Sequence, residues 1–569
     1  MRRSLLKTAV AAVLLCAAVR GSAQHVVSEP EGVKGHRRDL DALPARTVST
    51  RVSRGSRVAD TAAQPQVVTA PPDWKPIRIA VFSYDIEDSS RYCTEAEQLR
   101  PDFTSDTVVC EPEDVLTASK KQTLLEFLIP SAVRMHEERL SVQRERGNIV
   151  VDRLIDQDPY CRDFSIPDSH MREGVANADF LLYVAAGPIP SGATAWALTC
   201  QYFTNGRPSV GIANFSPEYI ANAQQTMRVV AHEILHALGF NYDVFEEQGM
   251  VGYVPSRGGK SDVPVINSPM VVAQARAHFG CSTQAFLELE DMGGRGTELS
   301  HWKRRSMKDD LMAGTTVAGI YSAITIAAME DMGFYKGNYS MAEPMMYGRN
   351  AGCRLMTEKC VVNGVSKFPE MFCGSANDSK LVCASDRLSV GFCYLVNHDL
   401  PLPPQFQYFS DATLGDADEE MDYCPYVQPY RRTFCSFDGR ELKGSVYGAR
   451  SRCFDAPAGF AEGGQSSAQY GLCAKVRCET TTYSVKVRGA GTFTRCTPGT
   501  TLTLSSLSSE FSDGHITCPP YDSVCGMRVN TTQTRRPGAA VADGTAAGSS
   551  VRMAGVLAAA TAVLALLPW

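Results

Sequence analysis

The chain has 569 residues, which is too long for one ordinary hydrophobic core and predicts about two to four domains at roughly 100–200 residues per domain. Hydrophobic residues make up 44% and charged residues 21%, as in ordinary folded proteins, which excludes wholesale disorder. The formal net charge is −6, so the basic surplus of a nucleic-acid-binding protein is absent and no nucleic acid is expected as a partner. The 19 cysteines indicate an oxidising compartment, because most would be free thiols without an evident role in a reducing cytosol.

The N-terminal residues have the pattern of a secretory signal peptide. Three basic residues precede an apolar run over 9–19, and the small residues Gly21-Ser22-Ala23 follow it. This run is shorter than the roughly 20 apolar residues that a membrane span needs. Cleavage after Ala23 would also remove Cys16 and leave an even number of cysteines, as a fully paired disulfide framework requires.

The C-terminal residues have the pattern of a glycosylphosphatidylinositol (GPI) attachment signal. Small residues over 542–546 are followed by a short polar stretch and by an uncharged apolar tail over 553–568. A transmembrane helix is the alternative, but the tail is short for spanning and no basic residue follows it. We predict a membrane partner through a GPI anchor, with Asp543 as the attachment residue.

Between the two ends, the first stretch, from residue 24 to about 72, contains no cysteine and no clear apolar period, which indicates a removable pro-segment. After it the pattern predicts a strand at 77–82, an amphipathic helix near 131–144, strands at 180–184 and 209–214, and a long helix that begins after Ser216-Pro217-Glu218 and ends at Gly239. Proline just inside a helix start and glycine just past its end is the expected asymmetry. This order predicts a mixed unit of helices and strands.

The composition changes after about Asn350. Thirteen cysteines lie from Cys353 to Cys525, among many Gly, Pro and Ser residues and short alternating runs such as 481–487. We therefore expect a loop-rich half that disulfides hold together, with a connectivity that spacing alone does not determine. The four early cysteines allow three pairings, and proximity along the chain favours Cys93 with Cys110 and Cys161 with Cys200.

Four N-x-Ser/Thr sequons are candidates for N-glycosylation, at Asn214, Asn338, Asn377 and Asn530. Pro217 directly follows the first of these sequons and disfavours its use.

The chemistry lies in residues 231–239, AHEILHALG. His232 and His236 are four residues apart in a helical pattern, so both imidazoles share one face and can reach one zinc ion at roughly 2.0–2.1 Å. Glu233 can then act on a water molecule at the metal as general base. The apolar flanks indicate a buried helix, in which these polar side chains need partners. The motif therefore favours a zinc site over a solvated helix face with two incidental histidines.

A catalytic zinc site needs a third protein ligand and an open fourth position. In the longer pattern H-E-x-x-H-x-x-G-x-x-H the glycine is present as Gly239, but Tyr242 occupies the place of the third histidine. The third ligand is therefore of another kind or is displaced downstream by an insertion. The later histidines are at positions 278, 301, 398 and 515.

Among these, His301 has the most informative neighbours. A glycine-rich stretch precedes it, and Asp309-Asp310-Leu311-Met312-Ala313-Gly314 follows. A methionine in a turn is the second mark of the metzincins, in which it lies under the zinc ligands. We therefore predict His301 as the third ligand and Met312 as the turn methionine. The alternative ligand set uses Glu288 or Glu290.

With these motifs the chain resembles the leishmanolysins, surface metalloproteases of trypanosomatid parasites that belong to the metzincins and carry a long insertion between the second and third histidines. The matching stretches span nearly the whole chain and include 77–81, 180–184, 195–197, 230–240, 262–267, the segment through Met312, 331–335, 421–425 and 517–521. The resemblance implies one Zn²⁺ per chain, held by His232, His236 and His301, with Glu233 as catalytic base. It also implies a fully disulfide-paired, GPI-anchored endopeptidase that cleaves proteins and peptides at the extracellular face of the plasma membrane.

The fold that the resemblance implies is of the α+β class in three parts: a metzincin-like domain with a mixed sheet and the active-site helix, a central domain with the third ligand and the methionine turn, and a disulfide-rich domain of strands and loops. The expected boundaries are 1–23 for the signal peptide, 24–67 for the pro-segment, 68–241, 242–352 and 353–543 for the three domains, and 544–569 for the removed GPI signal.

One departure from the family concerns latency. The pro-segment in this family typically carries a cysteine whose thiolate can occupy the open zinc position, whereas this sequence has Gly35-His36-Arg37-Arg38-Asp39 there. The usual latency mechanism is therefore not expected.

A surface adhesin with a structural or vestigial zinc site is the alternative function, suggested by the large cysteine-rich half. The presence of all four residues that the chemistry requires favours the enzyme.

Overall fold

The computed structural model describes residues 73–190, 193–221, 224–255, 260–294, 296–314, 318–374, 380–436, 442–467 and 469–526. The predicted signal peptide, the pro-segment and the GPI signal with Asp543 lie outside the described residues, as do the sequons at Asn377 and Asn530.

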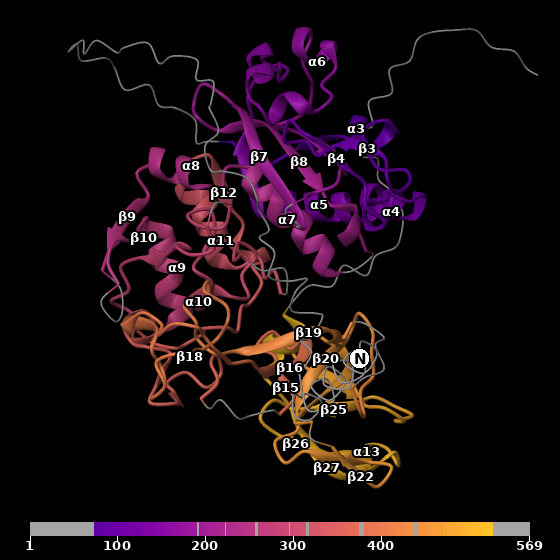
Figure 1. Cartoon of the computed structure of the whole chain (residues 1–569), viewed down its shortest axis with the longest axis vertical. Coiled ribbons are helices and arrows are strands. Elements are labelled where there is room, and N and C mark those ends of the chain that lie inside the picture. Colours follow the sequence, from indigo (N-terminus) through magenta and orange to yellow (C-terminus); the bar gives the residue numbers. More distant parts are fainter. Residues whose placement is uncertain are drawn as a thin grey trace, which may run out of the picture. The chain divides into compact units, whose positions relative to one another are not determined.

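A four-stranded sheet with the strand order β2-β6-β8-β7 forms the centre of the N-terminal part (Figure 1). Its strands are β2 (Ile79–Phe82), β6 (Phe180–Ala185), β8 (Pro208–Phe215) and β7 (Ala195–Tyr202). The first three run parallel to one another, and β7 pairs antiparallel with β8 at the edge. Each strand that the sequence predicted here is present, with bounds that differ by one or two residues.

Successive residues of these strands enter two different cores. On β6, Phe180, Leu182 and Val184 pack in the large hydrophobic cluster, whereas Leu181 and Tyr183 pack in a separate cluster on the opposite face. On the first face α7 (Gln224–Ala237) packs against β7 and β8, and α5 (Ile129–Arg139) packs against α7. Because side chains alternate across a strand, the wholly apolar run of β6 buries both faces of the sheet.

The helix predicted near 131–144 is shorter than expected. It begins at Ile129, with Pro130 in the first turn, and ends at Arg139. From Leu140 the chain is extended and forms β5 (Leu140–Gln143), which pairs with β1 (Trp74–Pro76) on one side and β12 (Tyr335–Gly337) on the other. Leu140 and Val142 alternate with polar residues and are buried, so the end of the predicted helix follows a strand period instead.

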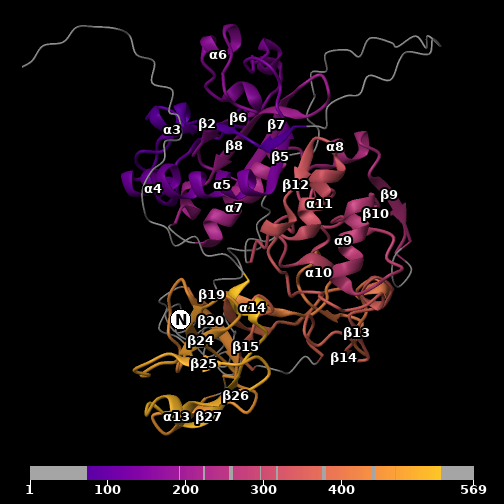
Figure 2. The same cartoon turned by 180° about the vertical axis from the view of Figure 1, so that it is seen from behind.

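The central segment carries helices around a small three-stranded sheet, as Figure 2 shows from behind. The sheet order is β11-β10-β9, with β9 at Val251–Val254, β10 at Val263–Ile266 and β11 at Leu287–Glu288. Its helices are α8 (Tyr242–Glu247), α9 (Pro269–Phe279), α10 (Arg304–Met307) and α11 (Ala323–Asp331). The Asp331 carboxylate accepts hydrogen bonds from Met270 N and Val271 N in the first turn of α9, which joins α11 to α9.

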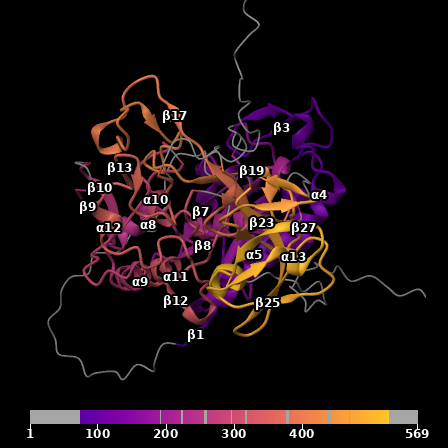
Figure 3. The ribbon, with the colours of Figure 1, turned by 90° about the horizontal axis from the view of Figure 1, so that it is seen from below.

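The C-terminal segment consists of small antiparallel sheets linked by loops (Figure 3). Two of them have four strands: β20 (Ser451–Asp455), β23 (Gly471–Cys478), β24 (Tyr483–Lys486) and β25 (Thr494–Cys496) form one, and β22 (Gln465–Ser467), β21 (Phe460–Glu462), β27 (Phe511–Thr517) and β26 (Thr501–Thr503) form the other. A three-stranded sheet joins β15 (Val382–Cys383), β16 (Ser389–Cys393) and β19 (Val427–Phe434).

The remaining elements are short. The strands are β3 (Leu99–Pro101), β4 (Thr107–Val109), β13 (Val361–Val362), β14 (Val365–Ser366), β17 (Val396–Asn397) and β18 (Leu414–Gly415). The helices are α3 (Tyr84–Glu87), α4 (Ala118–Thr123), α6 (Asp168–Arg172), α12 (Arg354–Thr357), α13 (Leu504–Leu507) and α14 (Tyr521–Cys525). Single helical turns lie at Pro112–Asp114, Leu124–Leu128, Arg153–Gln157, Cys161–Asp163, Pro217–Tyr219, Tyr339–Met341 and Pro404–Phe406.

Nine disulfides join the 18 cysteines of the described residues. The four early cysteines pair as Cys93 with Cys110 and Cys161 with Cys200, the pairing that proximity favours. The other bonds are Cys281–Cys353, Cys360–Cys424, Cys373–Cys393, Cys383–Cys453, Cys435–Cys473, Cys478–Cys525 and Cys496–Cys518.

The largest hydrophobic cluster runs from Ile77 to Tyr426 and therefore crosses the boundaries expected near residues 241 and 352. A second cluster, from Phe454 to Val524, lies within the C-terminal sheets. The mixture of helices, strands and disulfides confirms the α+β class. Within the described ranges, no helix is long and apolar enough to cross a bilayer.

Candidate metal centre and active site

The helix α7 holds two of the three predicted ligands in the core. It packs against β7, β8 and α5, and all its residues from Met227 to Ala237 are buried. Its last carbonyl groups have partners from other elements, because Thr199 Oγ1 donates to Ala237 O at 2.8 Å and Tyr335 OH donates to Leu238 O at 2.8 Å. These bonds satisfy the helix end and fix the position of His236 beside it.

Gly239 ends α7 and shapes the site. Its φ angle is +103°, which L side chains rarely adopt, and a Cβ here would lie 3.0 Å from Pro208 Cγ. The reversal brings Phe240 N to Leu235 O and Gly239 N to His236 O, the two hydrogen bonds of a Schellman motif. As a result Phe240 O faces His236 and accepts a hydrogen bond from Nδ1 at 2.8 Å.

The loop around Met312 holds the first histidine. His232 Nδ1 donates to Leu311 O at 2.6 Å, Met312 N donates to Asp310 Oδ1 at 2.8 Å, and Trp302 N donates to Met312 O at 2.9 Å. Met312 itself is fully buried. The predicted methionine turn is therefore hydrogen-bonded both to His232 and to the residue that follows His301.

The third histidine comes from a tight loop over 296–300. His301 is fully buried, and its Nδ1 donates to Thr297 O at 2.8 Å. Ser300 Oγ lies 3.1 Å from the same nitrogen and donates to Gly296 O. A backbone carbonyl of this loop thus orients His301, in the same way that the carbonyl groups of Phe240 and Leu311 orient His236 and His232.

The three Nε2 atoms converge on one point. They lie 2.9 Å apart for His232 and His236, 3.1 Å for His232 and His301, and 3.3 Å for His236 and His301. A tetrahedral ion about 2.0–2.1 Å from each nitrogen separates them by about 3.3–3.4 Å, so the triangle is close to that of a bound zinc. Because a carbonyl oxygen can only accept, each Nδ1 carries the proton and each Nε2 lone pair points at the centre. This donor set fits a metal ion.

The alternative glutamate ligands do not join this cluster. Among the described residues, the group able to hold a metal consists of His232, His236 and His301. Glu290 instead accepts from Lys303 Nζ at 2.6 Å and from Arg304 N at 2.9 Å, fully buried beside the segment that follows His301. Glu288 is buried on β11. Glu233 is fully buried on α7, next to His232 in the chain.

The Asp310 side chain supports the methionine turn, a role that the spacing of motifs in the sequence does not indicate. Its carboxylate accepts from Met312 N, from Thr325 Oγ1 at 2.6 Å and from Ser322 Oγ, and Thr325 Oγ1 in turn accepts from Trp302 Nε1 at 2.9 Å. Burial raises the pKa of Asp310 to about 6, although these three hydrogen bonds oppose the shift. One side chain therefore connects the methionine turn, α11 and the residue after His301.

Arg228, one turn before His232 on α7, is a second residue of this kind. Its guanidinium forms a bidentate pair with Glu343, with Nη2 2.7 Å from Oε1, and Nη1 also donates to Gly319 O at 3.0 Å. Both side chains are buried. The pair ties the active-site helix to the segment that follows the methionine turn, and no sequence motif marks it.

The other predicted residues lie away from the metal centre. Tyr242 is the first residue of α8, where its hydroxyl lies 2.6 Å from Tyr253 OH. Asn214 is fully buried on β8 and its amide bonds the backbone of Gly187, so the folded chain leaves no room for a glycan there. Burial therefore argues against this sequon, as Pro217 does in the sequence. Asn338 is exposed, and its Nδ2 donates to Glu138 O at 2.9 Å.

Comparison with known proteins decides the family. The family model described as leishmanolysin, peptidase family M8, matches residues 14–531. The chain belongs to the leishmanolysin family. The leishmanolysin of Leishmania major is 42% identical over 473 residues, which cover 81% of this chain and 78% of the relative. A leishmanolysin homolog of Crithidia fasciculata is 39% identical over 475 residues, 81% of this chain and 72% of the relative.

More distant relatives extend beyond the trypanosomatids. The leishmanolysin-like peptidase of Drosophila melanogaster is 29% identical over 460 residues, which cover 60% of this chain and 67% of the relative. Leishmanolysins are metalloproteases, so family membership implies a metal ion and protein or peptide substrates. Among the described residues, the cluster of His232, His236 and His301 is the group able to hold such an ion.

Proposed function

We propose that this leishmanolysin is a cell-surface zinc endopeptidase, with one Zn²⁺ held by His232, His236 and His301 and with Glu233 as general base. The observation that carries the proposal is the convergence of three Nε2 atoms within 3.3 Å of one another, from an HExxH helix and a distant loop. Three imidazole ligands leave one position of a tetrahedral ion open, as catalytic zinc sites require.

A zinc ion held by these histidines would act as a Lewis acid, polarising the scissile carbonyl and lowering the pKa of a bound water molecule. The protein residues supply the rest. The carbonyl oxygens of Leu311, Phe240 and Thr297 accept hydrogen bonds from the three Nδ1–H groups. Each imidazole is therefore held as the neutral tautomer whose Nε2 carries the free lone pair. The Glu233 carboxylate takes a proton from the attacking water and passes it to the leaving amine nitrogen.

The surface location rests on both chain ends. A signal peptide over 1–23 would send the chain into the secretory path, and a GPI anchor at Asp543 would hold it at the extracellular face. The nine disulfides support an oxidising compartment. We keep the domain boundaries at residues 241 and 352 as part of this proposal, with a hydrophobic core that continues across both.

The test replaces the base and removes the metal separately. Glu233→Ala should keep one zinc per chain and lower kcat/KM on a quenched peptide by about 10²–10⁴-fold, whereas exposed Glu370→Ala should change neither. Treatment with 1,10-phenanthroline should abolish cleavage, and added zinc should restore it. A Glu233→Ala chain that cleaves at the wild-type rate would contradict the assignment of the base. Activity that survives complete metal removal would contradict the metalloprotease.

A further inference from the structure

One face of the sheet β20-β23-β24-β25 is rich in cations. Lys475 on β23 lies directly opposite Lys486 on β24, and Ser484 lies between Arg477 and Arg495 in the next row. Directly opposite residues point to the same side of an antiparallel sheet, as do residues two apart, so all four cations share one face. On the other face Val476 and Val485 are buried in the C-terminal core.

These four cations, which we call the basic face, have no acidic neighbours on their own strands. The strands β23, β24 and β25 contain no Asp or Glu. Among the described residues, no carboxylate forms a salt bridge with Lys475, Arg477, Lys486 or Arg495, and Arg477 instead stacks 4.1 Å from the Phe493 ring. Like charges directly opposite each other destabilise a sheet, so the Lys475–Lys486 pair costs free energy unless an anion lies between the two.

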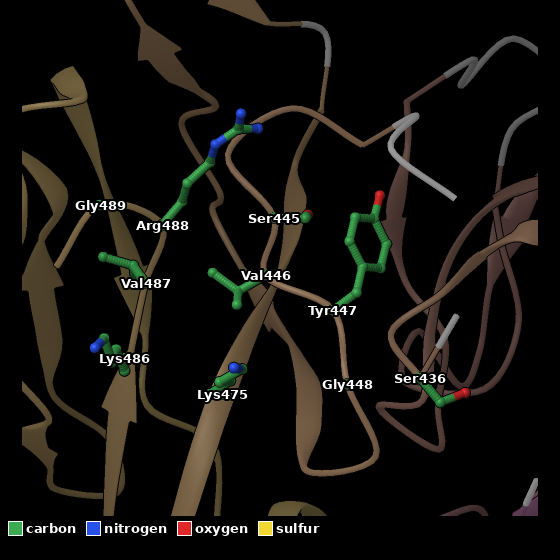
Figure 4. Close-up of a pocket in the computed structure, with 10 residues that line it drawn as sticks. All are labelled: Ser436, Ser445, Val446, Tyr447, Gly448, Lys475, Lys486, Val487, Arg488 and Gly489. Carbon is green, nitrogen blue, oxygen red and sulfur yellow. The ribbon is translucent and has the colours of Figure 1, made fainter. Parts of the chain in front are cut away.

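An open pocket of about 390 Å³ adjoins this face (Figure 4). Lys475, Lys486 and Arg488 line one side, and Tyr447 and Ser436 line the other. Arg488 is held at the rim by Glu462 at 3.4 Å and Glu510 at 3.2 Å. The hydroxyl groups add hydrogen-bond donors to the cations, so the pocket can bind an oxyanion.

The arrangement fits a chain of anions better than a single one. Neighbouring strands are about 4.8 Å apart, and residues two apart on one strand are about 6.8 Å apart, so the cations cover an open area rather than one point. Arginine guanidinium groups bind sulfate or phosphate oxygens with two hydrogen bonds. A disulfide-rich chain works outside the reducing cytosol, where the common linear polyanions are sulfated polysaccharides.

We propose that the basic face and its pocket bind a sulfated polysaccharide of the heparin type, with one sulfate group between Lys475 and Lys486 and further groups at Arg477 and Arg495. This site is separate from the metal centre and adds a binding activity to the proposed protease. Only the choice of a polysaccharide over other polyanions rests on the proposed extracellular location.

The test measures binding of the full secreted chain to immobilised heparin over a range of salt concentrations. Lys475→Gln with Lys486→Gln should weaken binding at least about tenfold and make its salt dependence shallower, because fewer counterions are released. Arg477→Gln with Arg495→Gln should do the same. Arg146→Gln with Lys367→Gln removes the same charge from exposed positions elsewhere and should change binding less than twofold.

Other ligands and a second readout make the test decisive. Desulfated heparin should fail to bind. Binding should be unchanged in Glu233→Ala, so failure of the protease assignment does not affect this result. An equal loss in the control pair would show a general charge effect and overturn the proposal. Stronger binding to acidic phospholipid vesicles or to nucleic acid than to heparin would overturn the choice of ligand. If inorganic sulfate displaced heparin completely at the same concentration of sulfate groups, the site would bind small anions and not a polysaccharide, which would also overturn the proposal.

Discussion

His232 Nδ1 donates to the carbonyl oxygen of Leu311 at 2.6 Å, and the two residues are 79 positions apart in the chain. This hydrogen bond joins the HExxH helix to the methionine turn. Leu311 is flanked by Asp310, whose carboxylate bonds Met312 N, and by Met312, whose carbonyl bonds the residue after His301. The methionine turn therefore sets the orientation of the His232 ring through its backbone, and not only by packing.

The first prediction follows from this arrangement. Asp310→Ala leaves three buried donors without an acceptor, at Met312 N, Thr325 Oγ1 and Ser322 Oγ, each of which costs about 1–3 kcal/mol. We expect the free energy of unfolding to fall by several kcal/mol and the zinc affinity to fall by about 10–100-fold. Competition with a fluorescent zinc chelator measures the affinity. Asp411→Ala removes an exposed carboxylate bonded only to Thr413 and should change neither quantity. An Asp310→Ala chain with wild-type zinc affinity would show that the turn does not position His232.

The second prediction concerns the third ligand. His301→Ala removes one of three converging nitrogens, so purified protein should contain less than about one tenth of the wild-type zinc, as measured by mass spectrometry of the metal. His398→Ala is the matched control. His398 donates to Asp416 O and does not belong to the three-histidine cluster, so this substitution should leave the zinc content unchanged. Unchanged zinc in His301→Ala would return the third position to another residue. Glu290 would need to break its pair with Lys303 to serve.

The convergence of the three histidines was predictable because each of them carries its own signal. A helical spacing of four places His232 and His236 together, and the Asp-Leu-Met-Ala-Gly run singles out His301 among the later histidines. The groups that orient these histidines were not predictable, because Leu311 O, Phe240 O and Thr297 O are backbone atoms that any residue type provides. Their positions depend on loop geometry, which residue spacing does not determine.

The helices and strands, like the histidine cluster, were predictable in part. Apolar runs such as 180–184 predicted the strands, since a buried strand is apolar on both faces. The helix near 131–144 was predicted too long, because a short window over 140–143 satisfies both a helical and an alternating period, and only pairing with β1 and β12 decides between them. The buried Arg228–Glu343 pair involves residues 115 apart, and a single sequence carries no sign that two such charges meet.

The third prediction is a pH dependence of stability. Burial, together with the nearby Arg139 charge, lowers the pKa of His136 from 6.5 to about 3, so this ring stays neutral in the folded chain. Below pH 6.5 the unfolded chain binds a proton that the folded chain does not, and stability present above pH 6.5 is lost as the pH falls toward 3. The slope is about 1.4 kcal/mol per pH unit for one proton. As the pH is lowered from about 7 to 4, the melting temperature should therefore fall less steeply for His136→Gln than for the native chain.

The comparison in this experiment is between the two chains at each pH. Both lose metal alike when the ligand histidines are protonated, so the difference between them isolates His136. The amide introduced by His136→Gln retains a hydrogen-bonding group for Tyr321 OH, which lies 3.2 Å from the native ring. If the melting temperatures of the two chains changed with pH in parallel, folding would not lower the pKa of His136 and the prediction would be wrong.

The fourth prediction concerns the disulfides. Because nine bonds account for all 18 described cysteines and Cys16 lies in the predicted signal peptide, thiol labelling of denatured, unreduced mature protein should find no free thiol. Replacing Cys435 and Cys473 by alanine should destabilise the protein by about 2–5 kcal/mol, since both lie in a small buried cluster with few other apolar contacts. Two or more labelled cysteines would contradict full pairing, and peptide mapping would identify them.

The last prediction distinguishes a GPI anchor from a transmembrane helix at the C-terminal end. An epitope tag placed after Trp569 should be absent from the mature surface protein if the apolar tail over 553–568 is removed on attachment, whereas a transmembrane helix keeps the tag. A chain that stops before Asp543 should appear in the medium as soluble, active protease, because it lacks both the attachment residue and the tail. A second tag placed just after the signal peptide site would be lost with the pro-segment, so an antibody to the folded ectodomain should follow the protein in every sample. Retention of the C-terminal tag at the cell surface, or retention of the truncated chain in membranes, would contradict the GPI anchor and leave the metal centre assignment intact.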